Sequence, residues 1–111
     1  MARTRITVLK RTVNQEIVDA HMGDEFRLRD GGIKCPVFED GEEFILDSWG
    51  TAPEGFCNWA WADLHKYILM IMGGGGYERP WTIPQHAAIG CCTDGYRPVI
   101  FKIERIEEGR G

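Results

Sequence analysis

The residues of this 111-residue chain with the most distinctive chemistry are its four cysteines, Cys35, Cys57, Cys91 and Cys92. A cysteine thiolate can act as a nucleophile or as a ligand for a soft metal ion. No two of the four form a C-x-x-C pair, so neither the zinc-ribbon nor the thioredoxin pattern applies. A site that joins Cys35, Cys57 and Cys91, with Cys92 as an alternative member, would have to be assembled by the fold.

Cys57 stands at or one residue before the start of a predicted helix over Trp59 to Met72. The positive end of the helix dipole and the unpaired backbone N–H groups stabilise a thiolate at such a position. Cys57 is therefore a candidate nucleophile or metal ligand. The alternative is a thiol that only packs beneath the aromatic sequence "NWAW".

The other cysteines fall on predicted strands. Cys35 precedes Pro36 on a predicted edge strand, because proline cannot donate a ladder hydrogen bond. Asp94-Gly95 signals a type I′ turn, which would place Cys92 opposite Arg97 and Cys91 opposite Pro98. Side chains alternate along a strand, so Cys92 would point into the core and Cys91 outward. Cys92 could be a small buried hydrophobe. An outward-facing residue that only filled space could be serine or threonine, so the thiol of Cys91 suggests a chemical role.

Two further residues are candidates for a site. His86 stands just before the hairpin and is the only histidine that we retain as a possible base or metal ligand. Arg97 could hold an anion or keep a nearby thiolate charged. Its alternative role is an ion pair with Asp94 or Glu54.

Length and composition indicate one domain covering residues 1–111. The formal net charge of −4 lacks the basic footprint that nonspecific nucleic-acid binding requires, so we expect no nucleic-acid partner. No apolar run approaches the roughly 20 residues that span a bilayer, and the charged start "MARTRITVLKR" is unlike a signal peptide. We expect a cytoplasmic protein without membrane contact, whose cysteines are free thiols.

The apolar pattern predicts the elements that must position these residues. The β-branched stretch "RITVLKRTV" predicts a strand over Arg5 to Val13, and Asn14 could cap a short helix ended by Gly23. Asp40-Gly41 predicts a turn between two strands, one around Val37 and Phe38 and one at Phe44 to Leu46.

The second half of the chain contains the principal helix and a C-terminal β-hairpin. Trp61, Leu64 and Ile68 recur at helical spacing, and Ile71 and Met72 continue the stripe. The sequence therefore predicts an α+β fold of about five mostly antiparallel strands, with one principal helix packed on one face. The segment Gly73 to His86 predicts a long irregular loop, either a lid or interface segment or a surface loop tacked to the core by its aromatic residues.

The segments "PEGFCNWAWADLHKYIL" and "CCTDGYRPVIFKIERIE" resemble the signature of an uncharacterised family of small proteins of anaerobic bacteria and archaea. "ITVLKR" and "CPVFEDGEEFI" also resemble it, so the likeness covers most of the chain. The resemblance implies no established activity, and an anaerobic setting fits the unpaired thiols. The positions that match the family pattern are Cys35, Cys57, Trp59, Trp61, Asp63, Cys91, Cys92, Thr93, Asp94, Gly95, Arg97 and Pro98.

Three functions are compatible with these observations. The first is a binding or accessory protein that self-associates or docks on a larger partner, since any of the four tryptophans not used in the core would be interface anchors. The second is a thiolate-bound metal or iron–sulfur site built from Cys57 and Cys91, with Cys35 or Cys92 completing it. The third is a small thiol-dependent enzyme with Cys57 as nucleophile and His86 as base.

Overall fold

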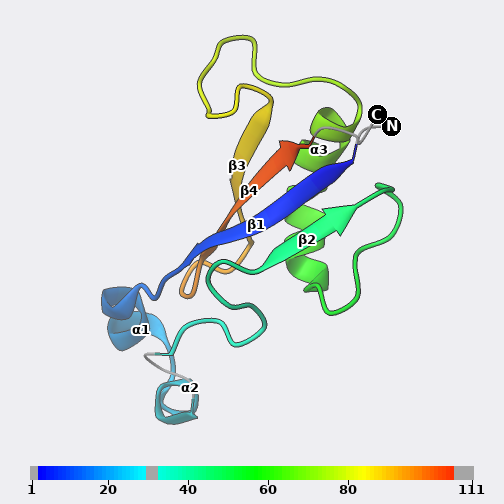
Figure 1. Ribbon diagram of the computed structural model, residues 1–111. Helices are drawn as coiled ribbons and strands as arrows, with labels where there is room; N and C mark the ends of the chain where they lie inside the picture. The colour runs from blue at the N-terminus through cyan, green and yellow to red at the C-terminus, as the bar shows by residue number, and fades with distance from the viewer. Residues whose placement is uncertain (1–2, 30–32, 107–111) are drawn as a thin grey trace.

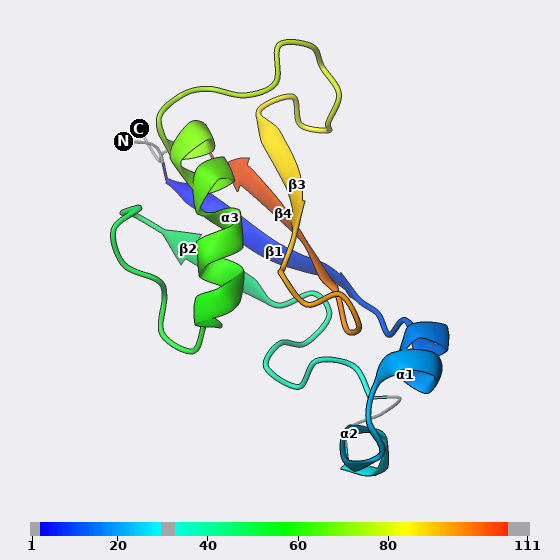
Figure 2. The same ribbon diagram turned by 180° about the vertical axis from the view of Figure 1, so that it is seen from behind.

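The computed structural model describes residues 3–29 and 33–106, which form a four-stranded sheet with a long helix packed on one face (Figures 1 and 2). The sheet has the order β2-β1-β4-β3, and all neighbouring strands are antiparallel. The expected mixed architecture, with one antiparallel sheet and one main helix, is confirmed. The elements are β1 (Thr4–Arg11), α1 (Gln15–His21), α2 (Asp24–Arg29), β2 (Glu43–Leu46), α3 (Asn58–Met72), β3 (Ala87–Cys91) and β4 (Val99–Arg105).

The core lies between α3 and the sheet. Leu64, Ile68 and Ile71 of α3 are fully buried, as the helical spacing predicts. Opposite them, the alternate residues Ile6 and Val8 of β1 are fully buried, whereas their neighbours along the strand are not. None of the helices in the described part of the chain has the length and apolarity that a membrane crossing requires.

The sheet has four strands, and the expected fifth strand around Val37 and Phe38 is wrong. Pro36 and Val37 form a turn, because proline lacks the amide hydrogen that a ladder needs. The Phe38 ring is buried against the rings of Phe56 and Phe101 at centroid distances of 5.1 and 5.2 Å. This segment is held by its aromatic side chain and not by strand pairing, so Cys35 lies on a loop.

The pairing of β3 with β4 is antiparallel, but the expected two-residue turn between them is wrong. Cys91 pairs with Ile100, which leaves residues 92–98 as the connection. Gly95 does not adopt the positive φ that a type I′ turn demands. Instead, the Asp94 carboxylate accepts hydrogen bonds from the amides of Tyr96 and Arg97, at 3.1 and 3.0 Å. The register moves by two residues, so the predicted inward and outward faces are unchanged.

Two short helices lie beyond the C-terminal end of β1, away from α3 (Figure 1). The expected helix after Asn14 is present as α1, but Asn14 makes no side-chain cap and donates to the Gly95 carbonyl instead, at 2.6 Å. α2 was not anticipated from the sequence. Its Phe26 ring packs edge-on against Tyr96, with centroids 4.9 Å apart, which ties this helix to the β3–β4 connection.

The loop between α3 and β3 is irregular, as expected, and is anchored at its start by Arg105. The Arg105 side chain donates to the carbonyls of Ile71 and Gly75, at 3.1 and 2.6 Å. Within the loop the rings of Tyr77 and Trp81 are 5.4 Å apart, and Trp81 is 71% exposed. The loop therefore combines a fixed start with an exposed aromatic residue.

Gly90 of β3 allows α3 to approach the sheet closely. A Cβ at this position would lie 2.7 Å from Leu64 Cδ2 and 3.2 Å from the Tyr67 ring. We expect Gly90→Ala to lower the free energy of unfolding by about 1–3 kcal/mol through overpacking, measured by urea denaturation. The control is Gly23→Ala, where a Cβ meets nothing within 4 Å, and equal losses in both variants would contradict the close-packing argument.

Candidate functional site

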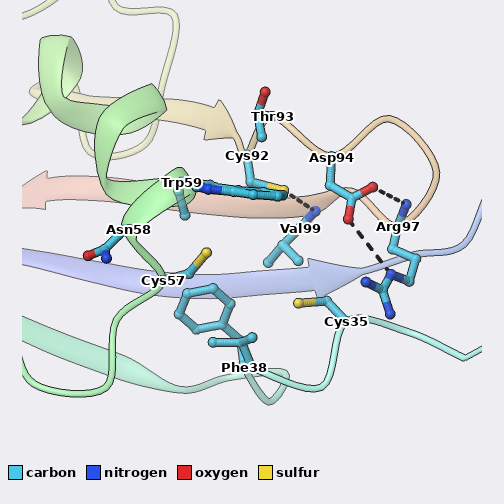
Figure 3. A pocket seen from close by; sticks show the side chains of 12 residues that line it. Cys35, Phe38, Cys57, Asn58, Trp59, Cys92, Thr93, Asp94, Arg97 and Val99 are labelled. Carbon is cyan, nitrogen blue, oxygen red and sulfur yellow. Dashed lines mark hydrogen bonds and ion pairs between the residues drawn. The ribbon is translucent and has the colours of Figure 1, made fainter. Parts of the chain in front are cut away.

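Three of the four cysteines line one pocket of about 350 Å³ between the start of α3, the segment before β2 and the β3–β4 connection (Figure 3). Cys35, Cys57 and Cys92 come from segments far apart in the sequence, and Figure 3 shows all three sulfurs directed toward the same space. We call this the thiol pocket. Its lining residues are Cys35, Val37, Phe38, Cys57, Asn58, Trp59, Ala60, Cys92, Thr93, Asp94, Arg97 and Val99.

Cys57 is the N-cap residue of α3, so the predicted position at the start of the helix is confirmed. It takes this place instead of Asn58, the better cap by residue type, because a turn fixes where the helix begins. The Phe56 amide donates to the Pro53 carbonyl at 3.1 Å, and Gly55 between them adopts a φ of +83°. Only glycine takes that conformation without strain, so the turn sets the first residue of α3.

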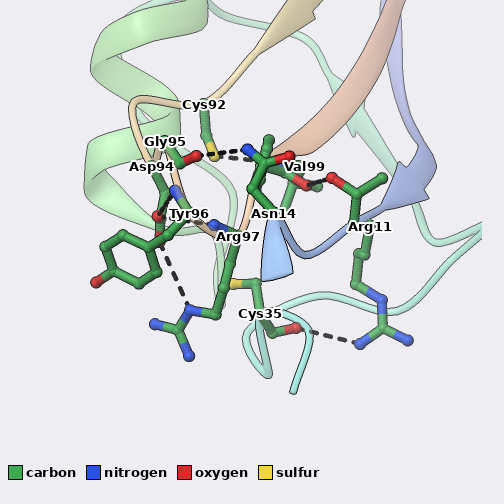
Figure 4. A network of polar contacts seen from close by, with 11 residues as sticks. Arg11, Asn14, Cys35, Cys92, Asp94, Gly95, Tyr96, Arg97 and Val99 are labelled. Carbon is green, nitrogen blue, oxygen red and sulfur yellow. Dashed lines mark hydrogen bonds and ion pairs between the residues drawn. The ribbon is translucent and has the colours of Figure 1, made fainter. Parts of the chain in front are cut away.

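Cys35 is positioned by Arg11, the last residue of β1 (Figure 4). The Arg11 guanidinium donates to the Cys35 carbonyl at 3.1 Å and to the Asp40 carboxylate at 3.1 Å. The Arg11 amide also donates to the same Asp40 oxygen, at 3.0 Å. These hydrogen bonds, and the nearby charges of Arg11 and Lys34, lower the pKa of Asp40. The loop that carries Cys35 is thereby fastened to the sheet by a charged side chain.

Cys92 directly follows β3 and continues its pairing with β4. Its amide donates to the Val99 carbonyl at 3.1 Å, and its sulfur accepts a hydrogen bond from the Val99 amide at 3.4 Å. The side chain is partly buried against the core, as predicted from strand alternation. Because the Val99 amide donates to the sulfur, the backbone of β4 sets the direction of the Cys92 side chain.

Arg97 and Asp94 lie together at the edge of the thiol pocket and form the ion pair expected as the alternative role of Arg97. Arg97 Nε lies 3.7 Å from Asp94 Oδ2, and both side chains are largely buried. The guanidinium also stacks on the Tyr96 and Phe26 rings, at 5.2 and 5.7 Å from their centroids. Arg97 Nε is buried and has no hydrogen-bond partner among the described residues. The Nε–H therefore takes part in the ion pair with Asp94 without making a hydrogen bond within the described chain.

Cys91 does not line the thiol pocket, so the structure separates it from Cys57. It pairs with Ile100 in the ladder and is exposed, as the outward orientation predicts. Although the residue is exposed, partial burial of its sulfur raises the pKa of Cys91 above its ordinary value of 9.0, and the neighbouring Cys92 and the carboxylate of Asp63 raise it further. At neutral pH this thiol is therefore protonated and a weak nucleophile.

The histidines lie outside the thiol pocket. His86 lines a different pocket, with Pro84, Gln85 and Arg105, beyond the end of α3 opposite Cys57. The structure therefore does not bring together the Cys57 nucleophile and His86 base considered for a thiol enzyme. His65 hydrogen-bonds the Trp49 carbonyl at 2.8 Å, which gives it a structural role.

The described residues show no preformed metal centre. Within residues 3–29 and 33–106, no group of three or more histidine, cysteine, aspartate or glutamate side chains is placed to hold a metal ion. Thiolate–zinc bonds are about 2.3 Å long, so ligand sulfurs must converge closely. The three thiols surround a volume that is larger than a bare ion needs.

Several walls of the thiol pocket were not predicted from the sequence. Phe38 and Val37 were expected on a strand, and Val99 only as a core residue. No local pattern could have found them, because they are apolar residues drawn from separate segments. Trp59 is 67% exposed, and the sequence singled it out only as one of four tryptophans and as part of the segment "NWAW".

No family model, curated protein or solved structure matches this chain. The fold and the geometry of the pocket are therefore the basis for any functional assignment.

The raised pKa of Cys91 predicts a distinctive pattern of alkylation. We expect iodoacetamide to modify Cys91 slowly at pH 7 and its rate to rise with pH through a midpoint above 9.0, because the protonated thiol persists longer. Asp63→Asn removes one negative charge and should shift the midpoint to lower pH. Peptide mass spectrometry follows the reaction. Asp47→Asn, which changes an exposed carboxylate paired with Arg3, is the control, and an equal shift there would contradict the role of Asp63.

Proposed function

We propose that the protein is a small binding protein and that the thiol pocket is its ligand site. The observation that supports this most strongly is the convergence of Cys35, Cys57 and Cys92 from three separate segments on one pocket of about 350 Å³. Filling the core would require each thiol to be buried, but it would not require the three to share a pocket. Seven positions of the family-like motifs line it: Cys35, Cys57, Trp59, Cys92, Thr93, Asp94 and Arg97.

The size and lining of the pocket favour a small organic group over a bare ion. Small-molecule sites typically enclose about 300–1,000 Å³ and combine apolar walls with a few polar groups. Phe38, Ala60 and Val99 provide apolar walls here, and the Arg97 guanidinium, paired with Asp94, provides a buried N–H group that makes no hydrogen bond within the described chain. We infer a ligand with a compact apolar body and a hydrogen-bond acceptor such as a carboxylate.

The exposed aromatic and aliphatic side chains are consistent with an accessory role. Trp59 stands at the thiol pocket, and Trp81 and Ile83 are exposed on the loop beyond the other end of α3, Ile83 at 89%. Exposed tryptophans are typical anchors of protein interfaces. A partner protein or a second copy of the chain could therefore present the ligand group or cover these residues.

Benzoate tests the ligand chemistry, since it joins an apolar ring to a carboxylate acceptor. We expect benzoate to bind and to slow the N-ethylmaleimide labelling of Cys35, Cys57 and Cys92, but not that of Cys91, measured by peptide mass spectrometry. Benzylamine, with the same ring and a cationic donor, should protect several-fold less.

Val37→Trp should block the pocket from its rim, because Val37 is half-exposed and lines it. The matched control, Ile83→Trp, adds the same side chain at a remote exposed position and should leave benzoate binding unchanged. The proposal fails if benzoate gives no protection in the wild-type protein, or if both variants bind it as the wild type does.

A soft metal ion bound by thiolates is a second candidate, favoured by the same three cysteines. Because no preformed metal group is present among the described residues, the loop of Cys35 would have to close on Cys57 and Cys92 to bring the sulfurs within bonding distance. An iron–sulfur cluster would make the same demand. In such a site Cys35, Cys57 and Cys92 would be the metal ligands, and Cys91 would not be a ligand.

Cobalt titration of anaerobically purified protein tests the metal candidate. A thiolate site should give thiolate-to-cobalt charge-transfer absorption, which Cys35→Ser, Cys57→Ser and Cys92→Ser should each remove. Cys91→Ser is the matched control and should retain the absorption. If the wild-type protein shows no such absorption, or if only Cys91→Ser abolishes it, the candidate is wrong.

A further inference from the structure

A second hollow, of about 430 Å³, shares Trp59 and Thr93 with the thiol pocket. It is open to solvent and is lined by Trp59, Ala62, Asp63 and Thr93. Figure 3 shows the Trp59 ring edge-on, with Thr93 on one side and Cys57 and Phe38 on the other. Trp59 therefore lines both hollows, and we call the second one, which Asp63 and Ala62 also line, the Asp63 hollow.

Asp63 contributes a carboxylate whose hydrogen bonding is incomplete. Its Oδ2 atom is buried, and none of the residues that the structure describes donates a hydrogen bond to it. Lys66, three residues further along α3, is not its partner, because the Lys66 ammonium lies over the Tyr67 ring at 5.2 Å. Buried polar atoms in native proteins almost always have partners, so this oxygen calls for a donor from outside the described chain.

The helix places this carboxylate beside the indole. Trp59 and Asp63 are four residues apart on α3, a spacing that makes their side chains neighbours on one helix face. Rotation about the Cβ–Cγ bond of aspartate is soft and roughly two-fold, so either oxygen can turn toward the hollow. An aromatic face and a carboxylate side by side are the two groups that recognise an organic cation.

The chemical class of the cation follows from the requirements of the Asp63 carboxylate and the Trp59 indole. The Asp63 carboxylate requires an N–H donor, which excludes quaternary ammonium groups as good ligands. A guanidinium is planar and weakly hydrated, so it can stack on an indole while its edge donates to a carboxylate. The Thr93 hydroxyl at the same hollow can accept a further N–H, and the net charge of −4 favours the approach of a cation.

We propose that the Asp63 hollow is a guanidinium-binding site, in which the ligand stacks on Trp59 and donates hydrogen bonds to Asp63. The guanidinium can belong to a free small molecule or to an arginine side chain of a polypeptide. Trp59 and Thr93 line both hollows, but none of the cysteines lines the Asp63 hollow, so this site is distinct from the one proposed for the thiol pocket.

Titration of isotope-labelled protein with methylguanidinium tests this proposal, followed by NMR of the Trp59 indole N–H and the Thr93 amide. We expect saturable shifts of both signals. Urea, which is planar and carries N–H donors without charge, and tetramethylammonium, which is charged without N–H donors, should each bind much more weakly. The peptide Gly-Arg-Gly distinguishes the sources: tighter binding than methylguanidinium indicates a polypeptide arginine, and equal binding indicates a free cation.

Variants of Asp63 and Trp59 test whether these residues bind the guanidinium. Asp63→Asn keeps the shape but removes the charge, and should weaken methylguanidinium binding about tenfold or more. Trp59→Leu should weaken it about threefold. The matched control is Trp81→Leu, which removes an exposed tryptophan elsewhere and should have no effect.

Val37→Trp, which blocks the thiol pocket, should also leave methylguanidinium binding intact, so that the two proposals can fail separately. The amide spectrum of each variant verifies its fold. If Asp63→Asn does not fold, the wild-type comparison of methylguanidinium with urea and tetramethylammonium still decides. Equal binding of urea or tetramethylammonium, or full binding by folded Asp63→Asn, would overturn the guanidinium site.

Discussion

The arrangement of this protein depends on a cluster of phenylalanine rings between α3 and the sheet. Phe38 is its centre, with Phe56 and Phe101 within 5.2 Å and Phe44 at 6.0 Å, centroid to centroid. Each of three rings is close in sequence to a wall of the thiol pocket: Phe38 follows Cys35, Phe56 precedes Cys57, and Phe101 follows Val99. Aromatic packing therefore brings together segments that no strand pairing joins, and it sets the positions of the thiols.

Polar contacts then fix the two loops that carry Cys35 and Cys92. Arg11 fastens the loop of Cys35 to the end of β1, and the Asp94 carboxylate shapes the β3–β4 connection that carries Cys92 and Arg97. Both proposed sites lie at the start of α3 and share the Trp59 indole. A ligand in one hollow could influence the other, since any movement of Trp59 changes both hollows.

Much of the fold could be predicted from local patterns. The presence of β1 and α3 and the turn at Asp40-Gly41 follow from periodicity and turn chemistry, which act over a few residues, although β1 ends at Arg11 and not at the expected Val13. The predictions failed where a side-chain contact overrode the local signal, over long range at Phe38 and within the loop itself at Asp94. The sequence around Phe38 predicts a strand, but the Phe38 ring packs in the core and no strand forms there. Asp94-Gly95 predicts a tight turn, but the Asp94 carboxylate accepts hydrogen bonds from amides of a wider loop.

For the site, residue types and strand alternation were enough to show which thiols are available and which way Cys91 and Cys92 face. Strand alternation placed Cys92 inward and Cys91 outward, because a register shift of two residues leaves the side-chain faces unchanged. Three-dimensional packing alone places Cys35, Cys57 and Cys92 at one pocket and Cys91 outside it, and it places Asp63 and Trp59 at one hollow. These relations depend on how α3, the sheet and two loops pack together. Packing is set by contacts between residues distant in the chain, which spacing along the sequence does not record.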